Sequence, residues 1–183
     1  MAGMQNGRVI YNLALIGFMG VGKSTIGQMA ANQLGYDFID SDACIEATVG
    51  MSISRIFAEY GEAHFRACEA ALVDELVHRR QVVLATGGGL AANPVHLNRL
   101  RQNALIVCLW ASPEAIWERV RHQTHRPLLQ TEDPLARIRQ LLAEREPHYR
   151  QADILVHTEM RTAREVVNQV VAQYRSACVP APA

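Results

Sequence analysis

The sequence is poor in lysine. Among its 18 basic residues, 17 are arginines, and Lys23 is the single lysine in a chain of 183 residues. A GTPase would need a further lysine in the N-K-x-D motif that recognises guanine. A protein kinase would need one in a V-A-I-K strand, which is also absent. The scarcity of lysine therefore excludes both of these classes.

Other features are missing as well. The formal net charge is zero, which argues against the broad basic surface of a nucleic-acid-binding protein. No apolar run approaches the length of about 18 residues that a membrane-spanning helix requires, and the first residues carry no signal-peptide pattern. The four cysteines are far apart and have no zinc-binding spacing (Cys44, Cys68, Cys108 and Cys178). We therefore expect a cytoplasmic protein that binds neither nucleic acid nor membrane.

Short apolar runs alternate with helical patterns along the chain. Several runs have the near-continuous apolar character of strands that are buried on both faces of a parallel sheet. They cover residues 9–17, 36–40, 81–87, 104–111 and 153–158. The alternation predicts a single α/β domain over residues 1–183, with a three-layer α/β/α arrangement and a mainly parallel sheet of about five strands. We expect a lid at residues 120–132, which follow neither periodicity, and a frayed tail at residues 176–183.

Several helices have recognisable starts. Asn93, Ser112 and Asp133 each precede a proline, which places a capping side chain before a residue suited to the first helical turn. Thr162 and Glu165 have the spacing of a capping box. In an α/β sheet of this kind, ligands bind at the carboxyl ends of the strands, so we expect the functional residues just after each strand.

The run "GFMGVGKST" at residues 17–25 follows the first predicted strand and opens a helix. Gly17, Gly22, Lys23 and Ser24 match the G-x-x-x-x-G-K-[ST] pattern of a P-loop. In such a loop the backbone N–H groups and the helix N-terminus hold phosphate oxygens, and the serine hydroxyl is a ligand for Mg²⁺. The residues expected at the nucleotide are Gly20, Val21, Gly22, Lys23, Ser24 and Thr25. With GTPases excluded, ATP is the expected phosphate donor.

The second and third predicted strands are followed by candidate residues for the phosphate acceptor. "FIDSD" ends in Asp40 and Asp42, which we expect on the same side, where one can hold Mg²⁺ and the other can orient or deprotonate a hydroxyl. Arg66 and Glu69 are three residues apart on a predicted helix, so that the carboxylate can hold the guanidinium in place. Three glycines after the third strand let the backbone approach a ligand closely, namely Gly87, Gly88 and Gly89.

Six motifs together point to one family. "RPLL" contains Arg126 in the expected lid, and "REPHY" contains Arg145 on a later helix. In this order and spacing the P-loop, "DSD", "GEAHFR", "TGGG", "RPLL" and "REPHY" resemble shikimate kinase, a family of nucleoside-monophosphate-kinase-like P-loop enzymes. The resemblance covers residues 9–175. It implies transfer of the γ-phosphoryl group of ATP to the 3-hydroxyl of shikimate, a step toward chorismate and the aromatic amino acids.

The resemblance also implies roles for individual residues. Asp40 matches the aspartate associated with Mg²⁺, and Asp42 matches the one that contacts the shikimate hydroxyls and can act as base. Arg66 and Arg145 match the arginines that bind the shikimate carboxylate, and the three glycines match a run that lines the substrate. Three arginines belong to the nucleotide side: Arg126 at the transferred phosphate, Arg119 beside the adenine and Arg161 in the adenine loop.

Two other interpretations share the P-loop. A kinase of the same fold that acts on gluconate would have no evident use for "GEAHFR", "TGGG" and "RPLL". A non-catalytic nucleotide- or shikimate-binding protein would not need the reactive groups that this chain combines, namely Lys23, Ser24, Asp40, Asp42 and Arg126. We expect instead a monomeric enzyme with shikimate and ATP as substrates and Mg²⁺ as cofactor.

The lysine of the P-loop leads to a first prediction. An ammonium is a compact charge on a flexible stem that can reach the β- and γ-phosphates inside a tight loop, whereas a guanidinium is planar and bulkier. We expect Lys23→Arg to lower the rate of phosphoryl transfer well below that of the wild type, measured as ADP released at saturating substrates. A wild-type rate in this variant would contradict the steric argument.

Overall fold

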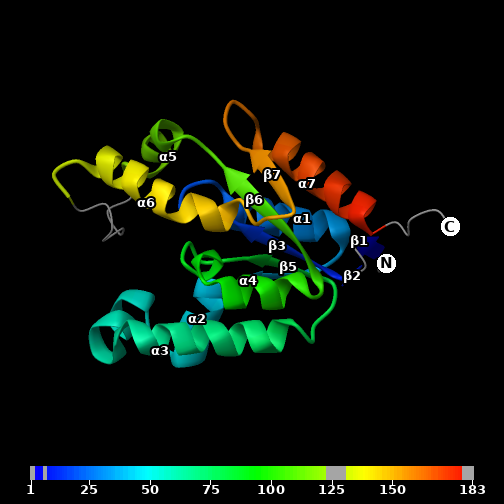
Figure 1. Cartoon of the computed structure of the whole chain (residues 1–183), viewed down its shortest axis with the longest axis horizontal. Helices are drawn as coiled ribbons and strands as arrows, with labels where there is room; N and C mark the ends of the chain where they lie inside the picture. Colours follow the sequence, from blue (N-terminus) through cyan, green and yellow to red (C-terminus); the bar gives the residue numbers. More distant parts are fainter. Residues whose placement is uncertain (1–2, 6–7, 123–130, 179–183) are drawn as a thin grey trace.

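The main sheet has five parallel strands. The computed structural model describes residues 3–5, 8–122 and 131–178 of the chain. The strands lie in the order β4-β5-β3-β6-β7 (Figure 1). They are β3 (Asn12–Ile16), β4 (Asp37–Asp40), β5 (Val82–Ala85), β6 (Ala104–Trp110) and β7 (Ile154–His157). The predicted number of strands and their parallel arrangement are confirmed.

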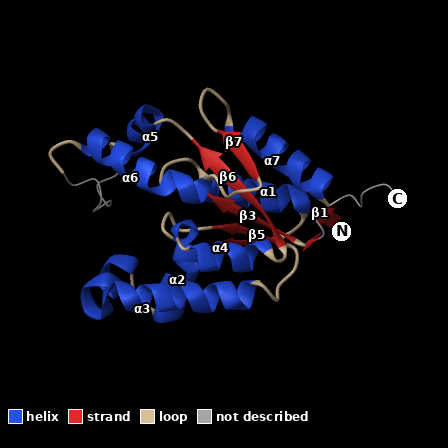
Figure 2. Cartoon of the chain, viewed as in Figure 1, coloured by secondary structure: helices blue, strands red, loops and turns tan. Residues whose placement is uncertain are grey.

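Helices flank the sheet on both faces (Figure 2). On one side α1 (Lys23–Leu34) packs against α7 (Ala163–Ala177), and on the other α3 (Ile53–Leu76) packs against α4 (Pro94–Arg101). The other helices of the described residues are α2 (Ser41–Val49), α5 (Pro113–Val120), α6 (Pro134–Tyr149) and the short 3₁₀ helix η1 (Leu90–Ala92). This is the predicted three-layer α/β/α fold. Within the described residues, no helix combines the length and the apolar character that a membrane span requires.

The predicted helix starts are confirmed. The side chains of Asn93, Ser112 and Asp133 each accept a hydrogen bond from a backbone N–H in the first turn of α4, α5 and α6, at 3.0, 3.2 and 2.9 Å. Thr162 and Glu165 form a complete capping box at the start of α7. Each cap satisfies a backbone donor that a helix leaves unpaired at its first turn. The starts of these four helices are therefore set by local sequence.

The first predicted strand, residues 9–17, is wrong in its extent. The strand is interrupted at Tyr11, where the N–H groups of Tyr11 and Asn12 both donate to the carbonyl oxygen of Asn103, at 2.8 and 3.1 Å. The residues before this point form β2 (Arg8–Ile10), which pairs antiparallel with β1 (Gly3–Gln5) in a separate two-stranded sheet. Apolar character alone does not specify which neighbour a strand pairs with.

Two segments, the lid and the C-terminal tail, were expected to lack regular structure, and each is described only in part. The predicted lid at residues 120–132 begins at the last residue of α5, and its residues 123–130 lie outside the described residues. The predicted tail at residues 176–183 is wrong at its start, because α7 continues to Ala177 and the capping residue Cys178 is 7% exposed. Residues 179–183 lie outside the described residues.

Candidate active site

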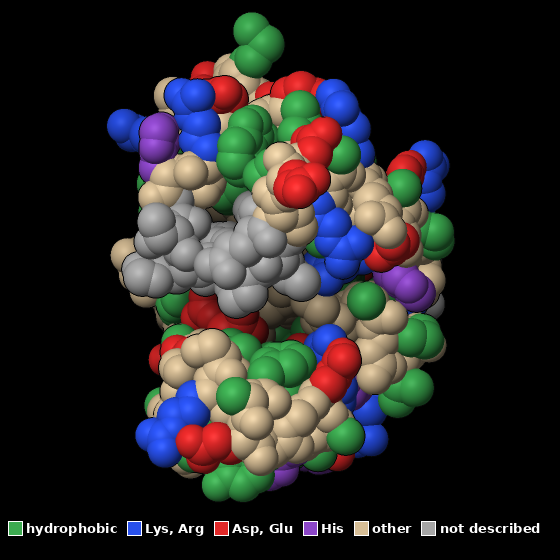
Figure 3. All heavy atoms as spheres, turned by 90° about the vertical axis from the view of Figure 1, so that its left-hand side faces the viewer, with side chains coloured by type: hydrophobic (Ala, Val, Ile, Leu, Met, Phe, Trp, Pro, Cys, Tyr) green, Lys and Arg blue, Asp and Glu red, His purple; other side chains and the backbone are tan. Residues whose placement is uncertain are grey.

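A pocket of about 360 Å³ lies at the carboxyl ends of the strands. The face of the molecule on this side is hollowed, and acidic side chains are visible inside the hollow (Figure 3). The pocket is lined by Met19, Gly20, Gly22, Lys23, Ser24, Thr25, Asp40, Asp42, Thr86, Gly87, Gly88 and Arg119. These residues come from the end of β4, from the chain segments that follow β3, β4 and β5, and from the last turn of α5. The structure thus brings most of the predicted site residues together.

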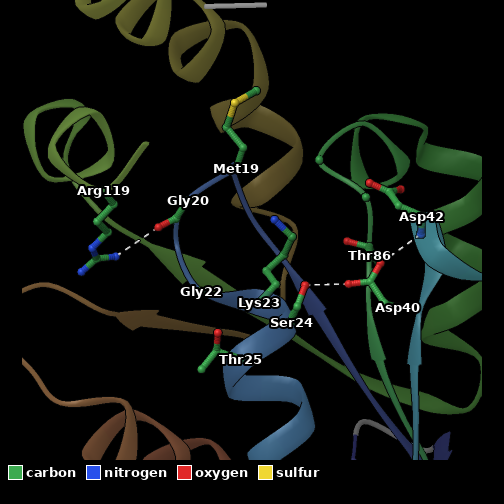
Figure 4. A pocket seen from close by; sticks show the side chains of 12 residues that line it. Met19, Gly20, Gly22, Lys23, Ser24, Thr25, Asp40, Asp42, Thr86 and Arg119 are labelled. Atoms are coloured by element: carbon green, nitrogen blue, oxygen red, sulfur yellow. Dashed lines mark hydrogen bonds between the residues drawn. The ribbon is translucent and has the colours of Figure 1, made fainter. Parts of the chain in front are cut away.

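The P-loop connects β3 to α1, as predicted. Gly17 and Gly22 have φ angles of 134° and 98°, which favour glycine over residues with a Cβ atom. The Lys23 ammonium folds back over its own loop and donates to the carbonyl oxygens of Gly17 and Phe18, at 3.0 and 2.8 Å. It lies at the start of α1 within the pocket (Figure 4). Val21 is 2% exposed and is not among the pocket-lining residues, so only its backbone is suited to bind phosphate.

Asp40 connects β4 to the P-loop through a hydrogen bond with Ser24. It is the last residue of β4 and caps α2, and its Oδ1 accepts hydrogen bonds from the N–H groups of Asp42 and Ala43 at 3.1 and 3.3 Å. Its Oδ2 accepts a hydrogen bond from the Ser24 hydroxyl at 2.6 Å (Figure 4). Hydroxyl and carboxylate oxygens are ligands that Mg²⁺ takes, and Mg²⁺ needs only one or two of them besides water and substrate phosphates. Ser24 and Asp40 therefore fit the predicted magnesium site.

Asp42 does not continue the strand that Asp40 ends. The chain turns into a helix after Asp40, so that Asp42 lies in the first turn of α2, and the expected strand-end pair is wrong in this respect. Both carboxylates still line the same pocket. Burial raises the pKa of Asp42 above its ordinary value, the Asp40 carboxylate raises it further, and the Lys23 ammonium opposes the shift. A carboxylate with a raised pKa is better suited to accept a proton.

The glycine run after β5 packs directly against Asp42. Gly87 and Gly88 line the pocket, and a Cβ atom on Gly87 would lie only 2.2 Å from Oδ1 of Asp42. The N–H of Gly87 donates to the hydroxyl of Ser41 at 2.6 Å. The sequence predicted that the backbone of this glycine binds substrate, but its N–H is already bonded within the protein. A larger residue at this position would therefore displace the Asp42 carboxylate.

Arg66 is held by two carboxylates on α3. Its guanidinium donates to Glu69 at 2.7 Å and to Glu62 at 2.8 Å. Glu69 is 1% exposed, so that this is not an ordinary surface ion pair. Burial raises the pKa of the Glu69 carboxyl, and the hydrogen bond and charge of Arg66 oppose the shift. The predicted fixing of Arg66 by Glu69 is confirmed, and the guanidinium lies next to Gly89, where a Cβ atom would be 2.9 Å from its Nη1.

Arg145 contacts the same glycine run as Arg66, but it belongs to α6 and not to α3. Its Nη1, on α6, donates to the carbonyl oxygen of Gly88 at 3.0 Å. The buried Tyr149 hydroxyl donates to the same oxygen at 3.4 Å, and the guanidinium is 5.4 Å from the centre of the Phe18 ring. Two planar cations, Arg66 and Arg145, therefore flank the loop that also touches Asp42.

Arg119 lines the pocket, whereas Arg161 does not. Arg119 donates to the hydroxyl and carbonyl oxygens of Thr158 at 2.9 and 2.7 Å, and to the carbonyl oxygen of Gly20 at 3.4 Å (Figure 4). The guanidinium of Arg161 bonds instead to Gln169 on α7. Arg126 lies outside the described residues, so its predicted role at the transferred phosphate stays a prediction.

Sequence reasoning missed three side chains that organise the pocket. Ser41 is the middle residue of the motif "DSD", but only the two aspartates were assigned roles from the sequence. Thr158 holds Arg119 and follows the fifth strand, where a polar residue at a carboxyl end is a usable signal. Tyr149 supports Gly88 and is the last residue of the quoted "REPHY". The bonds to Gly87, Arg119 and Gly88 that give these side chains their roles all join residues distant in the sequence.

The fold and the pocket define a class of protein. A P-loop follows the central strand β3, and the carboxylates of Asp40 and Asp42 line the same pocket. This is the arrangement of a P-loop kinase that phosphorylates a small molecule. Residues 19–175 match the family described as "SKI: Shikimate kinase". The chain belongs to the shikimate kinase family, whose members use ATP to phosphorylate shikimate.

Individual relatives agree with this family. A shikimate kinase from Halorhodospira halophila is 48% identical over 169 residues, which cover 92% of this chain and 96% of that protein. The structure of a shikimate kinase from Acinetobacter baumannii in complex with shikimate has a TM-score of 0.85 and 37% identity, and the match covers 91% and 94% of the two chains. The family resemblance predicted from the six motifs is confirmed.

A structure of a gluconate kinase shares the fold of this chain at low sequence identity. A gluconokinase from Sinorhizobium meliloti has a TM-score of 0.62 but only 20% identity, over 93% of this chain and 95% of that one. At this level the similarity extends to the fold alone.

The environment of Asp42 predicts a pH-dependent effect on stability. Because its pKa is raised on folding, the ionised carboxylate costs stability above that pKa, and the cost disappears as the pH falls below the ordinary value of 3.8. We expect Asp42→Asn to unfold at a higher temperature than the wild type at pH 7, in buffer without Mg²⁺ or nucleotide. The difference should shrink when thermal unfolding is repeated at pH values down to about 4. A variant that is less stable at pH 7, or a gain that does not change with pH, would contradict this assignment.

Proposed function

We propose that the pocket transfers the γ-phosphoryl group of Mg²⁺-bound ATP to the 3-hydroxyl of shikimate, and that the residues named below carry out this transfer. The observation that carries the proposal is the position of Asp42. Its carboxylate shares a pocket with the P-loop lysine and touches the glycine run that two arginines flank. An anionic polyol placed there would have a base, a carboxylate-binding site and a phosphate donor within reach.

On the donor side, the P-loop backbone and the N-terminus of α1 bind the phosphates of ATP. Lys23 moves from the carbonyl oxygens of its own loop to the β- and γ-phosphates, and its charge stabilises the negative charge of the transition state. Arg119 lies at the nucleotide end of the pocket, fixed by Thr158. Arg126 binds the transferred phosphate, as the family resemblance implies.

On the acceptor side, Arg66 and Arg145 bind the shikimate carboxylate. Two guanidinium groups suit a planar carboxylate because each can form paired hydrogen bonds with it. Asp42 accepts the proton of the 3-hydroxyl as the hydroxyl oxygen attacks the γ-phosphorus, and the bond from that phosphorus to the β–γ bridging oxygen breaks to release ADP. With the N–H of Gly87 bonded to Ser41, the substrate contacts of the glycine run fall to Gly88 and Gly89.

The magnesium ion belongs beside the P-loop. Ser24 and Asp40 would hold it, because their oxygens are already adjacent at 2.6 Å and come from the two segments that meet at the phosphates. Bound there, Mg²⁺ supplies charge neutralisation of the phosphate oxygens. We further propose that the protein acts as a monomer in the cytoplasm.

The direct test measures ADP release by the purified protein with ATP and Mg²⁺, with shikimate, with gluconate and without an acceptor. We expect release that depends on shikimate. Binding of nucleotide and shikimate without product would favour a non-catalytic binding protein, and turnover with gluconate would overturn the acceptor assignment.

The role of Arg66 predicts a selective defect. We expect Arg66→Met to raise the KM for shikimate by about tenfold or more, because a charge-assisted hydrogen bond is lost, while the KM for ATP changes little. Arg55→Met is the matched control, since Arg55 lies on the same helix and pairs with Glu59 on the exposed surface. An unchanged KM for shikimate in Arg66→Met would contradict the carboxylate-binding role.

The role of Asp42 predicts a defect in turnover. We expect Asp42→Asn to lower kcat by about a hundredfold, because an amide cannot accept the proton of the hydroxyl. Affinity for ATP should stay nearly intact, as measured by nucleotide titration. Near-normal turnover would mean that Asp42 only orients the substrate.

A further inference from the structure

The hydroxyl group of Ser41 is buried at the centre of the acceptor side. Ser41 is the first residue of α2, between Asp40 and Asp42, and it is 0% exposed. Its Oγ accepts a hydrogen bond from the N–H of Gly87 at 2.6 Å and donates to Oδ1 of Asp42 at 3.4 Å. One hydroxyl therefore connects the start of α2 with the loop that follows β5, although the two segments are 46 residues apart.

We infer that Ser41 is a positioning residue for phosphoryl transfer, which fixes the Asp42 carboxylate relative to the glycine run. The inference rests on the proposed function, in which Asp42 receives the proton of the acceptor hydroxyl. Ser41 does not touch the substrate, and it acts through the orientation of its neighbour.

The contacts of Asp42 explain how this works. Oδ1 of Asp42 accepts the hydrogen bond of the Ser41 hydroxyl. The same oxygen packs against Gly87, where a Cβ atom would lie only 2.2 Å from it. The loop cannot move away from the carboxylate without breaking the short, buried hydrogen bond between Gly87 and Ser41. The bridge thus holds the loop against the Asp42 carboxylate, whereas a loop without this bond could move away from it.

A purely structural role for Ser41 is the alternative. A buried hydroxyl that only satisfies a backbone N–H would also lower stability when removed. The two roles predict different effects of removing Ser41 on kcat. If Ser41 acts through Asp42, its removal lowers kcat only while Asp42 is there to be positioned.

The test is a double-mutant cycle on kcat, measured as shikimate-dependent ADP release at saturating substrates. We expect Ser41→Ala to lower kcat by about tenfold, because a small displacement of a reacting group has large effects on rate. In the Asp42→Asn background the same change should lower kcat by less than about twofold. The KM for ATP should change little. Ser41→Cys, with a similar volume and a weaker acceptor, should fall between the wild type and Ser41→Ala.

Ser52→Ala is the matched control. Ser52 caps α3 and its hydroxyl accepts one backbone N–H, from Arg55 at 3.4 Å, but it does not line the pocket. We expect this variant to lose some thermal stability and to keep the wild-type kcat.

Three outcomes would count against the inference. Wild-type kcat in Ser41→Ala with a lower unfolding temperature would mean that the hydroxyl is only structural, and an equal loss of kcat in both backgrounds would show that Ser41 does not act through Asp42. If Ser41→Ala does not fold, Ser41→Cys takes its place in the cycle, and a wild-type kcat there would overturn the inference. Near-normal kcat in Asp42→Asn alone would instead contradict the proposed function.

Discussion

The parallel alignment of β3, β4 and β5 is the constraint on which the site depends. β5 pairs with both neighbours in register, so that Ala85 lies opposite Leu15 on one side and Asp40 on the other. Because the three strands run in the same direction, the chain segments that follow them leave the sheet at one edge. The phosphate loop, the start of α2 and the glycine run meet there. An antiparallel strand at any of these positions would place one of the three components at the opposite edge.

The carboxylates at this edge differ in their hydrogen-bond partners. Asp40 accepts two backbone N–H groups and a hydroxyl, and Glu69 is paired with Arg66. Asp42 has the Ser41 hydroxyl at 3.4 Å and the charge of Lys23, and burial outweighs both, so that its pKa is raised. Carboxylates in different surroundings can take on different functions. The oxygens of Asp40, next to the Ser24 hydroxyl, suit a cation, and the Asp42 carboxylate, whose pKa is raised, suits a proton.

Local signals in the sequence predicted local structure well. The P-loop, the four capped helix starts and the pairing of Arg66 with Glu69 each depend on residues within a few positions of one another. The errors arise where the partner is distant. The strand break at Tyr11 depends on Asn103, and the bridge from Ser41 to Gly87 depends on a sheet register that composition does not reveal. Asp42 is an intermediate case, since the capping ability of Asp40 could have indicated that a helix begins between the two aspartates.

The unequal use of lysine and arginine follows from the acceptors that each meets. Arg66, Arg119 and Arg145 hold their guanidinium groups against fixed oxygens of carboxylates and backbone, where a planar, multidentate donor has an advantage. Lys23 instead binds two successive carbonyl oxygens of a loop that turns around it. In the proposed reaction Lys23 exchanges these oxygens for phosphate within the same tight loop, which favours a small charge on a flexible stem. Under the proposed function, phosphate and backbone share this one position, and it is the position at which an arginine-rich chain retains lysine.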